Sequence, residues 1–130
     1  MTSSITMKRE VSGTAEEVVE RVTNVLKAEG FGVLTRIDFH SKMKEKLGKD
    51  LPPVVILGAC NPSLAYEAYQ ANTDVAALLP CNAVVREIGS GKCSVELAKP
   101  SGMMTMLGNA NLVKLAATAD DVLARALAKV

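Results

Sequence analysis

The spacing of hydrophobic residues predicts a helix near each end of the chain. Apolar side chains recur every three or four residues over residues 18–26 and again over residues 115–130, a period that places them on one face of a helix. Thr14 and Glu17 fit a capping box at the start of the first helix. Gly30 fits its end, because glycine enters the left-handed backbone conformation cheaply.

Stretches with a strand-like pattern lie between these helices. The clearest is residues 31–39, where apolar and polar side chains alternate as in a half-buried strand. The predicted strands are residues 5–11, 31–39, 54–57, 75–79 with 83–88, and 92–98. Pro80 interrupts the fourth of these, and the Gly-Ser-Gly sequence at residues 89–91 predicts a hairpin turn before the fifth.

Two shorter helices are predicted between the strands. Residues 41–47 form the first. The second begins at Asn61 and Pro62, because asparagine caps a helix and proline suits its first turn, and it ends near Asn72. Residues 100–108 are predicted to be a loop rich in methionine. Strands followed and covered by helices in this order predict an α+β sandwich.

Length, composition and charge narrow the class of protein. A chain of 130 residues suits a single domain, residues 1–130, that buries about 65–70% of its unfolded surface. Apolar residues make up 48% of the chain and charged residues 22%, which predicts a packed core rather than disorder. The net charge of +1 gives no general attraction to nucleic acid or to an anionic membrane. With no stretch resembling a signal peptide or a membrane span, we expect a soluble cytoplasmic protein with neither of these partners.

The candidate chemistry centres on two Cys-Asn dipeptides, each of which follows an apolar run. The first pair is Cys60 and Asn61, in VVILGACNP, and the second is Cys81 and Asn82, in VAALLPCNAVV. A thiol beside an amide, twice, indicates one site assembled from two loops. Cys60 lies just outside the N-terminus of the predicted helix, whose dipole favours an anionic thiolate. The alternative is that both cysteines are small buried hydrophobic residues and both asparagines are caps or turn residues.

Soft-metal binding is one hypothesis for this site. Cu(I) prefers thiolate and thioether ligands, so Cys60 and Cys81 are candidate metal ligands, and Met103, Met104 and Met106 are further sulfur donors. The structural alternative is that loop methionines pack as adaptable apolar side chains. Zinc is disfavoured, because one histidine and three scattered cysteines lack the usual spacing of zinc ligands.

A thiol-dependent redox enzyme that uses Cys60 and Cys81 is the second hypothesis. The three cysteines form no CxxC pair, and in a reducing cytosol they would be free thiols, metal ligands or transient redox groups. The single histidine, His40, is predicted to be a solvated surface residue, and Cys93, within a predicted strand, to be a packing residue. Asp38 ends a predicted strand, where it could be a ligand or base and could equally cap the next helix.

Four motifs in a fixed order resemble a known family. They are Gly30-Phe31 with Ile37-Asp38, Lys44-Glu45-Lys46-Leu47-Gly48, Ala59-Cys60-Asn61-Pro62 and Leu79-Pro80-Cys81-Asn82. These motifs resemble those of the family known as domain of unknown function 302. The flanking helices also fall where that family has them, so the resemblance covers nearly the whole chain. The resemblance implies an α+β domain with a curved, mostly antiparallel sheet packed against helices, similar to the TATA-binding-protein-like fold. The implied order is β-α-β, then further strands, then a C-terminal helix. A homodimer is also implied, but no activity and no cofactor.

The sequence therefore leaves three functions open. The first is a module that binds a small ligand or a soft metal at a paired Cys-Asn site, formed by Cys60, Asn61, Cys81 and Asn82, with Asp38 as a further candidate. The second is the thiol-dependent redox enzyme. The third is a structural homodimer in which these motifs form turns and interface without a ligand. The separation of the two cysteines distinguishes these functions, since Cα atoms within ~7 Å can be bridged by a disulfide or share a metal.

Overall fold

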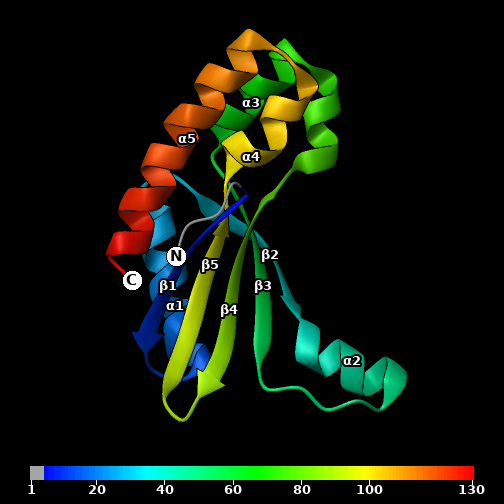
Figure 1. Cartoon of the computed structure of the whole chain (residues 1–130), viewed down its shortest axis with the longest axis vertical. Helices are drawn as coiled ribbons and strands as arrows, with labels where there is room; N and C mark the ends of the chain where they lie inside the picture. The colour runs from blue at the N-terminus through cyan, green and yellow to red at the C-terminus, as the bar shows by residue number, and fades with distance from the viewer. Residues whose placement is uncertain (1–4) are drawn as a thin grey trace.

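A computed structural model describes residues 5–130, which fold into an antiparallel sheet and a set of helices (Figure 1). The elements follow one another as β1 (Thr6–Ser12), α1 (Ala15–Ala28), β2 (Gly32–Asp38), α2 (Phe39–Leu47), β3 (Val54–Cys60), α3 (Pro62–Ala71), the 3₁₀ helix η1 (Thr73–Leu78), β4 (Cys81–Gly89), β5 (Lys92–Ala98), α4 (Pro100–Met104), the 3₁₀ turn η2 (Thr105–Leu107) and α5 (Ala110–Ala128). The strands are ordered β1-β5-β4-β3-β2, and each neighbouring pair is antiparallel. The predicted α+β class and C-terminal helix are confirmed.

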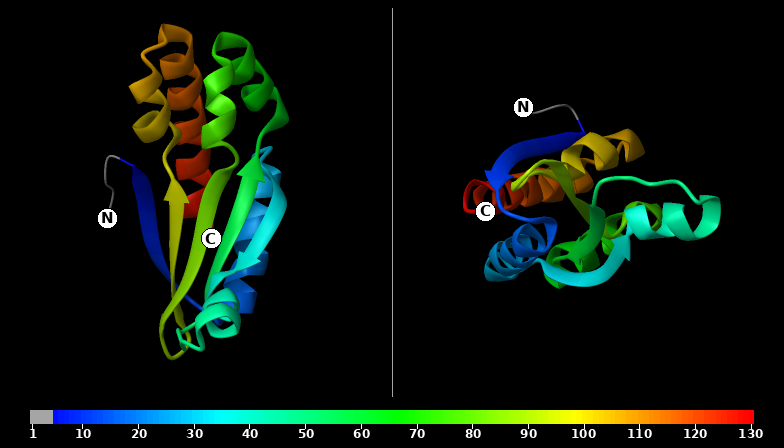
Figure 2. Two further views of the ribbon diagram at one scale, coloured as in Figure 1. Left: turned by 90° about the vertical axis from the view of Figure 1, so that its right-hand side faces the viewer. Right: turned by 90° about the horizontal axis from the view of Figure 1, so that it is seen from below.

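One face of the sheet packs against α1 and α5 (Figure 2). Alternate strand residues point to this face, and Leu57, Val85 and Val95 are almost wholly buried there. They form one apolar cluster with Leu26 of α1 and Leu123 of α5. Each such side chain stabilises the fold by roughly 1.5–3 kcal/mol relative to an exposed position.

The predicted ends of α1 are confirmed. The backbone N–H of Glu17 donates to the hydroxyl of Thr14 at 3.3 Å, and the N–H of Thr14 donates to the Glu17 carboxylate at 2.9 Å, which completes the capping box. Gly30 follows the helix with a φ of +86°, in the left-handed region that glycine adopts without steric cost.

A second, smaller apolar cluster lies beyond one end of the sheet. It joins Ala68 of α3, Val75 of η1 and Met104 of α4 to Leu112 and Ala116 in the first half of α5. Figure 1 shows these helices grouped together at the end of the sheet where β3 and β5 finish. The molecule thus has two cores that meet along α5, because the second half of that helix packs on the sheet.

The strand predicted over residues 75–79 is wrong. Thr73–Leu78 forms a 3₁₀ helix instead, and the strand begins only at Cys81, after Pro80. The side chain of Asn72 accepts a hydrogen bond from the N–H of Asp74 at 2.9 Å and starts this helix. Val75 is fully buried against the other helices, so packing rather than strand propensity determines the conformation here.

The loop predicted over residues 100–108 is also wrong in part. Pro100–Met104 is a short helix with proline in its first turn, followed by a single 3₁₀ turn. The carboxylate of Asp120 on α5 accepts a hydrogen bond from the N–H of Ser101 at 3.1 Å. That partner is 19 residues away in the chain, and no local pattern indicates it.

The other face of the sheet is not covered by any helix described in residues 5–130 (Figure 2). β2 is an edge strand of the sheet. The alternation of buried and exposed residues that the sequence predicts for it is absent, since no residue of β2 is buried. A register shift between Val33 and Thr35 breaks its alternation. Ile37, an apolar residue of this alternation, is 46% exposed because it pairs with Ile56 on the uncovered face.

The long helix α5 confirms the apolar helix face predicted over residues 115–130, and it begins several residues earlier than that pattern indicates. It begins at Ala110, where the side chain of Asn109 accepts hydrogen bonds from the N–H groups of Asn111 and Leu112. Its exposed side mixes charged and polar residues with alanines and Val113. No helix within residues 5–130 has both the length and the apolar character needed to cross a bilayer.

Candidate functional site

The two Cys-Asn motifs lie together at one end of the sheet. Cys60 is the last residue of β3 and Cys81 is the first residue of β4, and Ala59 pairs directly with Cys81 in this antiparallel pair. With strands about 4.8 Å apart and a rise of about 3.3 Å per residue, the two cysteine Cα atoms are ~6 Å apart. That separation is within the ~7 Å over which cysteines can be bridged or share a metal.

The two thiols differ in exposure and interact electrostatically. Cys81 is buried, Cys60 is half-buried, and neither is in a disulfide. Burial raises the pKa of the Cys81 thiol to about 11, and the nearby charges of Cys60 and Asp120 add to this effect. Cys81 is therefore a neutral thiol at pH 7.

Asn61 has the structural role that the sequence predicts for it. Its side-chain oxygen accepts a hydrogen bond from the N–H of Leu64 at 3.1 Å, so it caps α3, and Pro62 occupies the first turn. Its amide nitrogen lies close to Gly30, where a Cβ atom would be only 3.0 Å away. Asn61 thus fixes the direction in which the chain leaves Cys60.

The contact between Gly58 and Pro80 determines how closely β3 and the start of β4 lie next to the two cysteines. A Cβ atom on Gly58 would lie 2.7 Å from Cγ of Pro80 and would overlap the hydroxyl of Thr35. Glycine is therefore the residue that lets Pro80 pack onto β3. Because Pro80 directly precedes Cys81, this contact sets the position of the second thiol.

A small cavity of about 30 Å³ lies where the end of the sheet meets the second apolar cluster. Cys60, Cys81 and Met104 line it together, so three sulfur-bearing residues share one space. Nearly all its other lining residues are apolar: Phe31, Ala59, Leu64, Ala65, Ala68, Leu79, Pro100, Leu115, Ala116 and Ala119, with Asn61 as the exception. Such a wall offers few partners to water, which needs two to four polar groups to occupy a buried space.

The three methionines named from the sequence separate in the structure. Met104 is 5% exposed and lines the cavity, whereas Met106 is 86% exposed and points to solvent. Met103 is half-buried and is absent from the cavity wall. Among residues 5–130, no cluster of three or more histidine, cysteine, aspartate or glutamate side chains could hold a metal ion. Any metal in this cavity would depend on sulfur ligands.

Asn82 does not join this site. It pairs with Gly58 and is exposed, whereas its neighbour Cys81 points to the buried face. Asn82 is not among the residues that line the cavity. The repeated dipeptide therefore contributes two thiols but only one capping amide.

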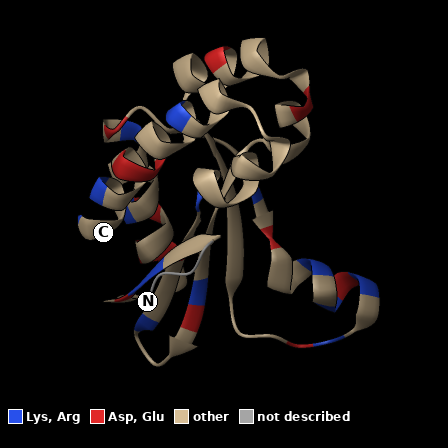
Figure 3. Cartoon of the chain, turned by 45° about the horizontal axis from the view of Figure 1, so that its top comes forward, with Lys and Arg blue, Asp and Glu red and all other residues tan. Residues whose placement is uncertain are grey.

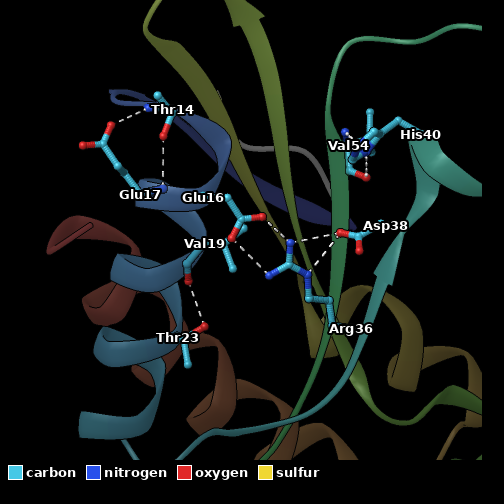
Figure 4. Close-up of polar contacts among 9 residues, drawn as sticks. All are labelled: Thr14, Glu16, Glu17, Val19, Thr23, Arg36, Asp38, His40 and Val54. Carbon is cyan, nitrogen blue, oxygen red and sulfur yellow. Dashed lines mark hydrogen bonds and ion pairs between the residues drawn. The ribbon is translucent and has the colours of Figure 1, made fainter.

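Asp38 lies far from the cysteines. It pairs with Val55, five residues before Cys60 on β3, which corresponds to about 16 Å along the strand. It precedes α2 but makes no capping hydrogen bond. Its carboxylate instead accepts hydrogen bonds from Arg36, at 3.1 and 3.0 Å, and Arg36 also pairs with Glu16 of α1 (Figure 4). Hydrogen bonding to Arg36 lowers the pKa of the Glu16 carboxyl. This ion cluster links β2 to α1.

His40 and Cys93 also lie away from the cavity. His40 is half-buried rather than a solvated residue, and its Nδ1 atom accepts a hydrogen bond from the N–H of Val54 at 3.0 Å, which ties α2 to β3 (Figure 4). Cys93, predicted to be a packing residue in a strand, is fully buried and pairs with Glu87 near the β4–β5 hairpin, at the opposite end of β4 from Cys81. Burial raises the pKa of its thiol.

The residues that sequence reasoning missed come from helices remote in the chain. Leu115, Ala116 and Ala119 of α5 form one wall of the cavity, and Asp120 contributes to the raised pKa of Cys81. Their spacing indicates only an amphipathic helix. Nothing in that pattern specifies which strand ends the helix will cover.

Comparisons with known proteins agree with the motifs found in the sequence. The model of the family described as "Domain of unknown function DUF302" matches residues 7–130. The crystal structure of an uncharacterized conserved protein DUF302 from Bacillus stearothermophilus is 34% identical in sequence, with a TM-score of 0.87. That similarity covers 95% of this chain and 96% of the other. No curated protein matches the chain.

Proposed function

Because this chain belongs to the DUF302 family, whose description assigns no activity, we propose a function from its own site: it binds one soft metal ion, Cu(I), with Cys60, Cys81 and Met104. The observation that carries the proposal is the presence of these three sulfur-bearing residues around one small apolar cavity. Thiolates and thioethers are the ligands that select Cu(I). Oxygen-binding cations such as Mg²⁺ and Ca²⁺ would find no carboxylate on this wall.

The size of the cavity favours an ion over an organic ligand. Pockets for drug-sized molecules measure roughly 300–1,000 Å³. The cavity here, about 30 Å³, is roughly a tenth of the smallest of these volumes. A single ion fits that space, and half-buried Cys60 gives it a route from solvent.

Binding would relieve the electrostatic conflict between the two thiols. The charge of Cys60 adds to the cost of ionising Cys81, so two thiolates side by side are unfavourable without a cation. Cu(I) would form a bond to each sulfur as each thiol releases its proton to solvent, leaving a complex with one net negative charge. Met104 would add a neutral donor, which does not increase that charge.

The alternative of a thiol-dependent redox enzyme has weaker support. An attacking cysteine needs a substantial thiolate fraction, and the raised pKa of Cys81 keeps it protonated at neutral pH. His40 is hydrogen-bonded to Val54, six residues before Cys60 on β3, so it lies about 20 Å along the strand from the thiols and is too far away to activate either of them. The short distance between the cysteines would still permit a disulfide, which a binding experiment under reducing conditions separates from metal binding.

The proposal is tested by titrating reduced, anaerobic protein with Cu(I) in competition with a chromophoric chelator. We expect one ion per chain. Loss of a residue that only supports a metal ligand typically weakens metal binding by roughly 10–100-fold. Cys60→Ser and Cys81→Ser should each weaken Cu(I) binding by more than this, and Met104→Leu should weaken it by about tenfold. Circular dichroism of each variant establishes that it is folded.

Two matched variants control for general effects of sulfur loss. Cys93→Ser removes a buried thiol at the other end of the sheet, and Met106→Leu removes an exposed thioether two residues from Met104. Both should bind Cu(I) as the wild type does. The proposal is wrong if the wild type takes up no Cu(I), or if the control variants weaken binding as much as the cavity variants do.

A further inference from the structure

An open cleft lies beside β1, towards the opposite end of the sheet from the cavity that holds the thiols. It has a volume of about 550 Å³ and lies where β1 meets α1 and the C-terminal end of α5. Seen from below in Figure 2, this end of α5 lies between β1 and α1. Four basic residues line the cleft against a single carboxylate side chain, that of Glu10; the four are Arg9, Arg21, Lys92 and Lys129. The excess of positive charge attracts anions.

The two lysines of the cleft already have carboxylate partners. The Nζ atom of Lys92 lies 3.2 Å from the carboxylate of Glu10, and the Nζ atom of Lys129 lies 3.4 Å from the carboxylate of Glu29. Each of these pairs is close to neutral. The uncompensated positive charge of the cleft therefore belongs to the two arginines.

Both arginines are held by backbone carbonyl groups. Nη1 of Arg9 donates to two carbonyl oxygens in the last turn of α5, at 3.1 and 2.7 Å, and Nη2 of Arg21 donates to the carbonyl of Ser12 at 2.6 Å. Neither guanidinium forms an ion pair with a carboxylate in residues 5–130. Glu17, one turn before Arg21 on α1, accepts the capping hydrogen bond of Thr14 instead. A carbonyl oxygen positions a guanidinium but leaves its charge in place.

The remaining N–H groups of these arginines have no partner in the described chain. Nε and Nη2 of Arg9 make no hydrogen bond within residues 5–130, and neither do Nε and Nη1 of Arg21. Parallel N–H groups on one edge of a guanidinium match two oxygens of a phosphate or carboxylate. Because the protein already holds both side chains in place, less conformational entropy is lost when an anion binds.

We propose that this cleft binds a small organic phosphate, with the guanidinium groups of Arg9 and Arg21 contacting the phosphate. A phosphate monoester carries a charge of about −1.5 to −2 at pH 7, which the two uncompensated arginines match. Sites for small organic molecules measure roughly 300–1,000 Å³, so the cleft has room for an organic group beside the phosphate. The cleft shares no residue with the cavity between the thiols, so this proposal does not depend on metal binding.

The confinement of the positive charge to this cleft favours a small ligand over nucleic acid. On the uncovered face of the sheet, Lys8 and Arg86 both pair with Glu96, at 4.0 and 3.4 Å. Figure 3 shows basic and acidic residues interleaved, on α2 as elsewhere in this view, with no continuous basic stripe. Nucleic acid requires such a stripe to neutralise successive phosphates, whereas a single phosphate group requires only a local excess of cations.

Isothermal titration calorimetry in a phosphate-free buffer of low ionic strength tests the proposal, with phenyl phosphate as the probe. We expect one molecule bound per chain with a dissociation constant below about 1 mM. Benzoate, which carries one negative charge, should bind more weakly, and phenol should not bind. The absence of binding at about 10 mM phenyl phosphate, or equal affinities for phenyl phosphate and benzoate, would overturn the proposal.

Substitutions in the cleft identify the contacts. Arg9→Gln and Arg21→Gln should each weaken the binding of phenyl phosphate by about 10–100-fold, the value of a hydrogen bond to a charged group. Glu10→Gln should strengthen it a few-fold, because the change removes a negative charge and frees Lys92. Arg125→Gln is the matched control, since Arg125 pairs with Glu29 outside the cleft wall, and its affinity should equal that of the wild type.

Two further results would contradict the proposal. One is a loss of affinity in Arg125→Gln as large as that in the cleft variants, and the other is an unchanged or lower affinity in Glu10→Gln. Because Arg9 also contacts the end of α5, circular dichroism verifies the fold of each variant, and Arg21→Gln with Glu10→Gln decides the question if Arg9→Gln unfolds. Vesicles containing phosphatidic acid carry the same phosphate monoester on a lipid. Binding to them more tightly than to phenyl phosphate would replace the small molecule by a lipid headgroup.

Discussion

The affinity of the cavity for Cu(I) should rise with pH by at least about tenfold per unit between pH 7 and pH 9. Cys81 has a pKa of about 11, so it carries its proton throughout this range and must release it to bind the metal. Each bound ion therefore displaces one full proton from Cys81 alone, and a change of one pH unit is worth about 1.36 kcal/mol. Any proton released by Cys60 adds to this slope.

The cost of ionising Cys81 gives the size of the effect. Four pH units below its pKa, at pH 7, removing the proton opposes binding by about 5 kcal/mol, and at pH 9 the cost falls to about 3 kcal/mol. Affinity should consequently increase at least 100-fold over these two units. Burial is the largest cause of the raised pKa, so the dependence is a property of the folded cavity.

Chelator competition at a series of pH values measures the slope, after correction for protonation of the chelator itself. The Cys93→Ser variant should give the same slope as the wild type, because that buried thiol lies at the other end of the sheet. Cys81→Ser should show a slope smaller by one proton per ion. An affinity that stays constant from pH 7 to pH 9 in the wild type would refute the role of Cys81 as a ligand.

Three further predictions concern the stability of the fold around the cavity. Gly58→Ala should lower the free energy of unfolding, measured in urea, by about 1–3 kcal/mol, because the new Cβ atom would meet Pro80 and Thr35. Adding Thr35→Ala should restore part of this loss. An unchanged midpoint of the urea unfolding curve would contradict this packing. Asn61→Ala should cost about 1 kcal/mol through the lost cap of α3, while Asn61→Asp should retain most of the stability. Stability should fall by about 2 kcal/mol as pH rises from 9 to 11, because the unfolded thiol of Cys81 ionises near 9.0 while the folded one keeps its proton. Well below pH 9 this contribution is constant, and Cys81→Ser should remove this part of the loss.

The sequence predicts those features whose cause lies within a few residues. Thr14 and Glu17 are three positions apart, and Asn61 and Pro62 adjoin the helix that they start, so their roles follow from local hydrogen bonding. Residues 75–79 fail as a prediction because the burial of Val75 depends on helices far away in the chain. There, tertiary packing overrides a strand-like composition.

The candidate site shows the same limit. The sequence indicates that Cys60 and Cys81 belong together, but their separation depends on the register of β3 against β4, which the contact of Gly58 with Pro80 sets. A methionine-rich stretch predicts neither the cavity nor the fact that Met104, and not its neighbours, lines it. Both depend on where α5 packs. The absence of Asn82 from the cavity wall is likewise evident only from the structure.

The two apolar clusters that share α5 have a consequence for local unfolding. The helical group can open by breaking contacts of Leu112 and Ala116 while Leu123 and Leu127 remain packed on the sheet. Amide hydrogen exchange should therefore be graded along this one helix, faster in its first turns than in its last. An ion held jointly by the strand ends and α4 would join the two cooperative units, and its binding should slow exchange in the first half of α5 towards the rate of the second half.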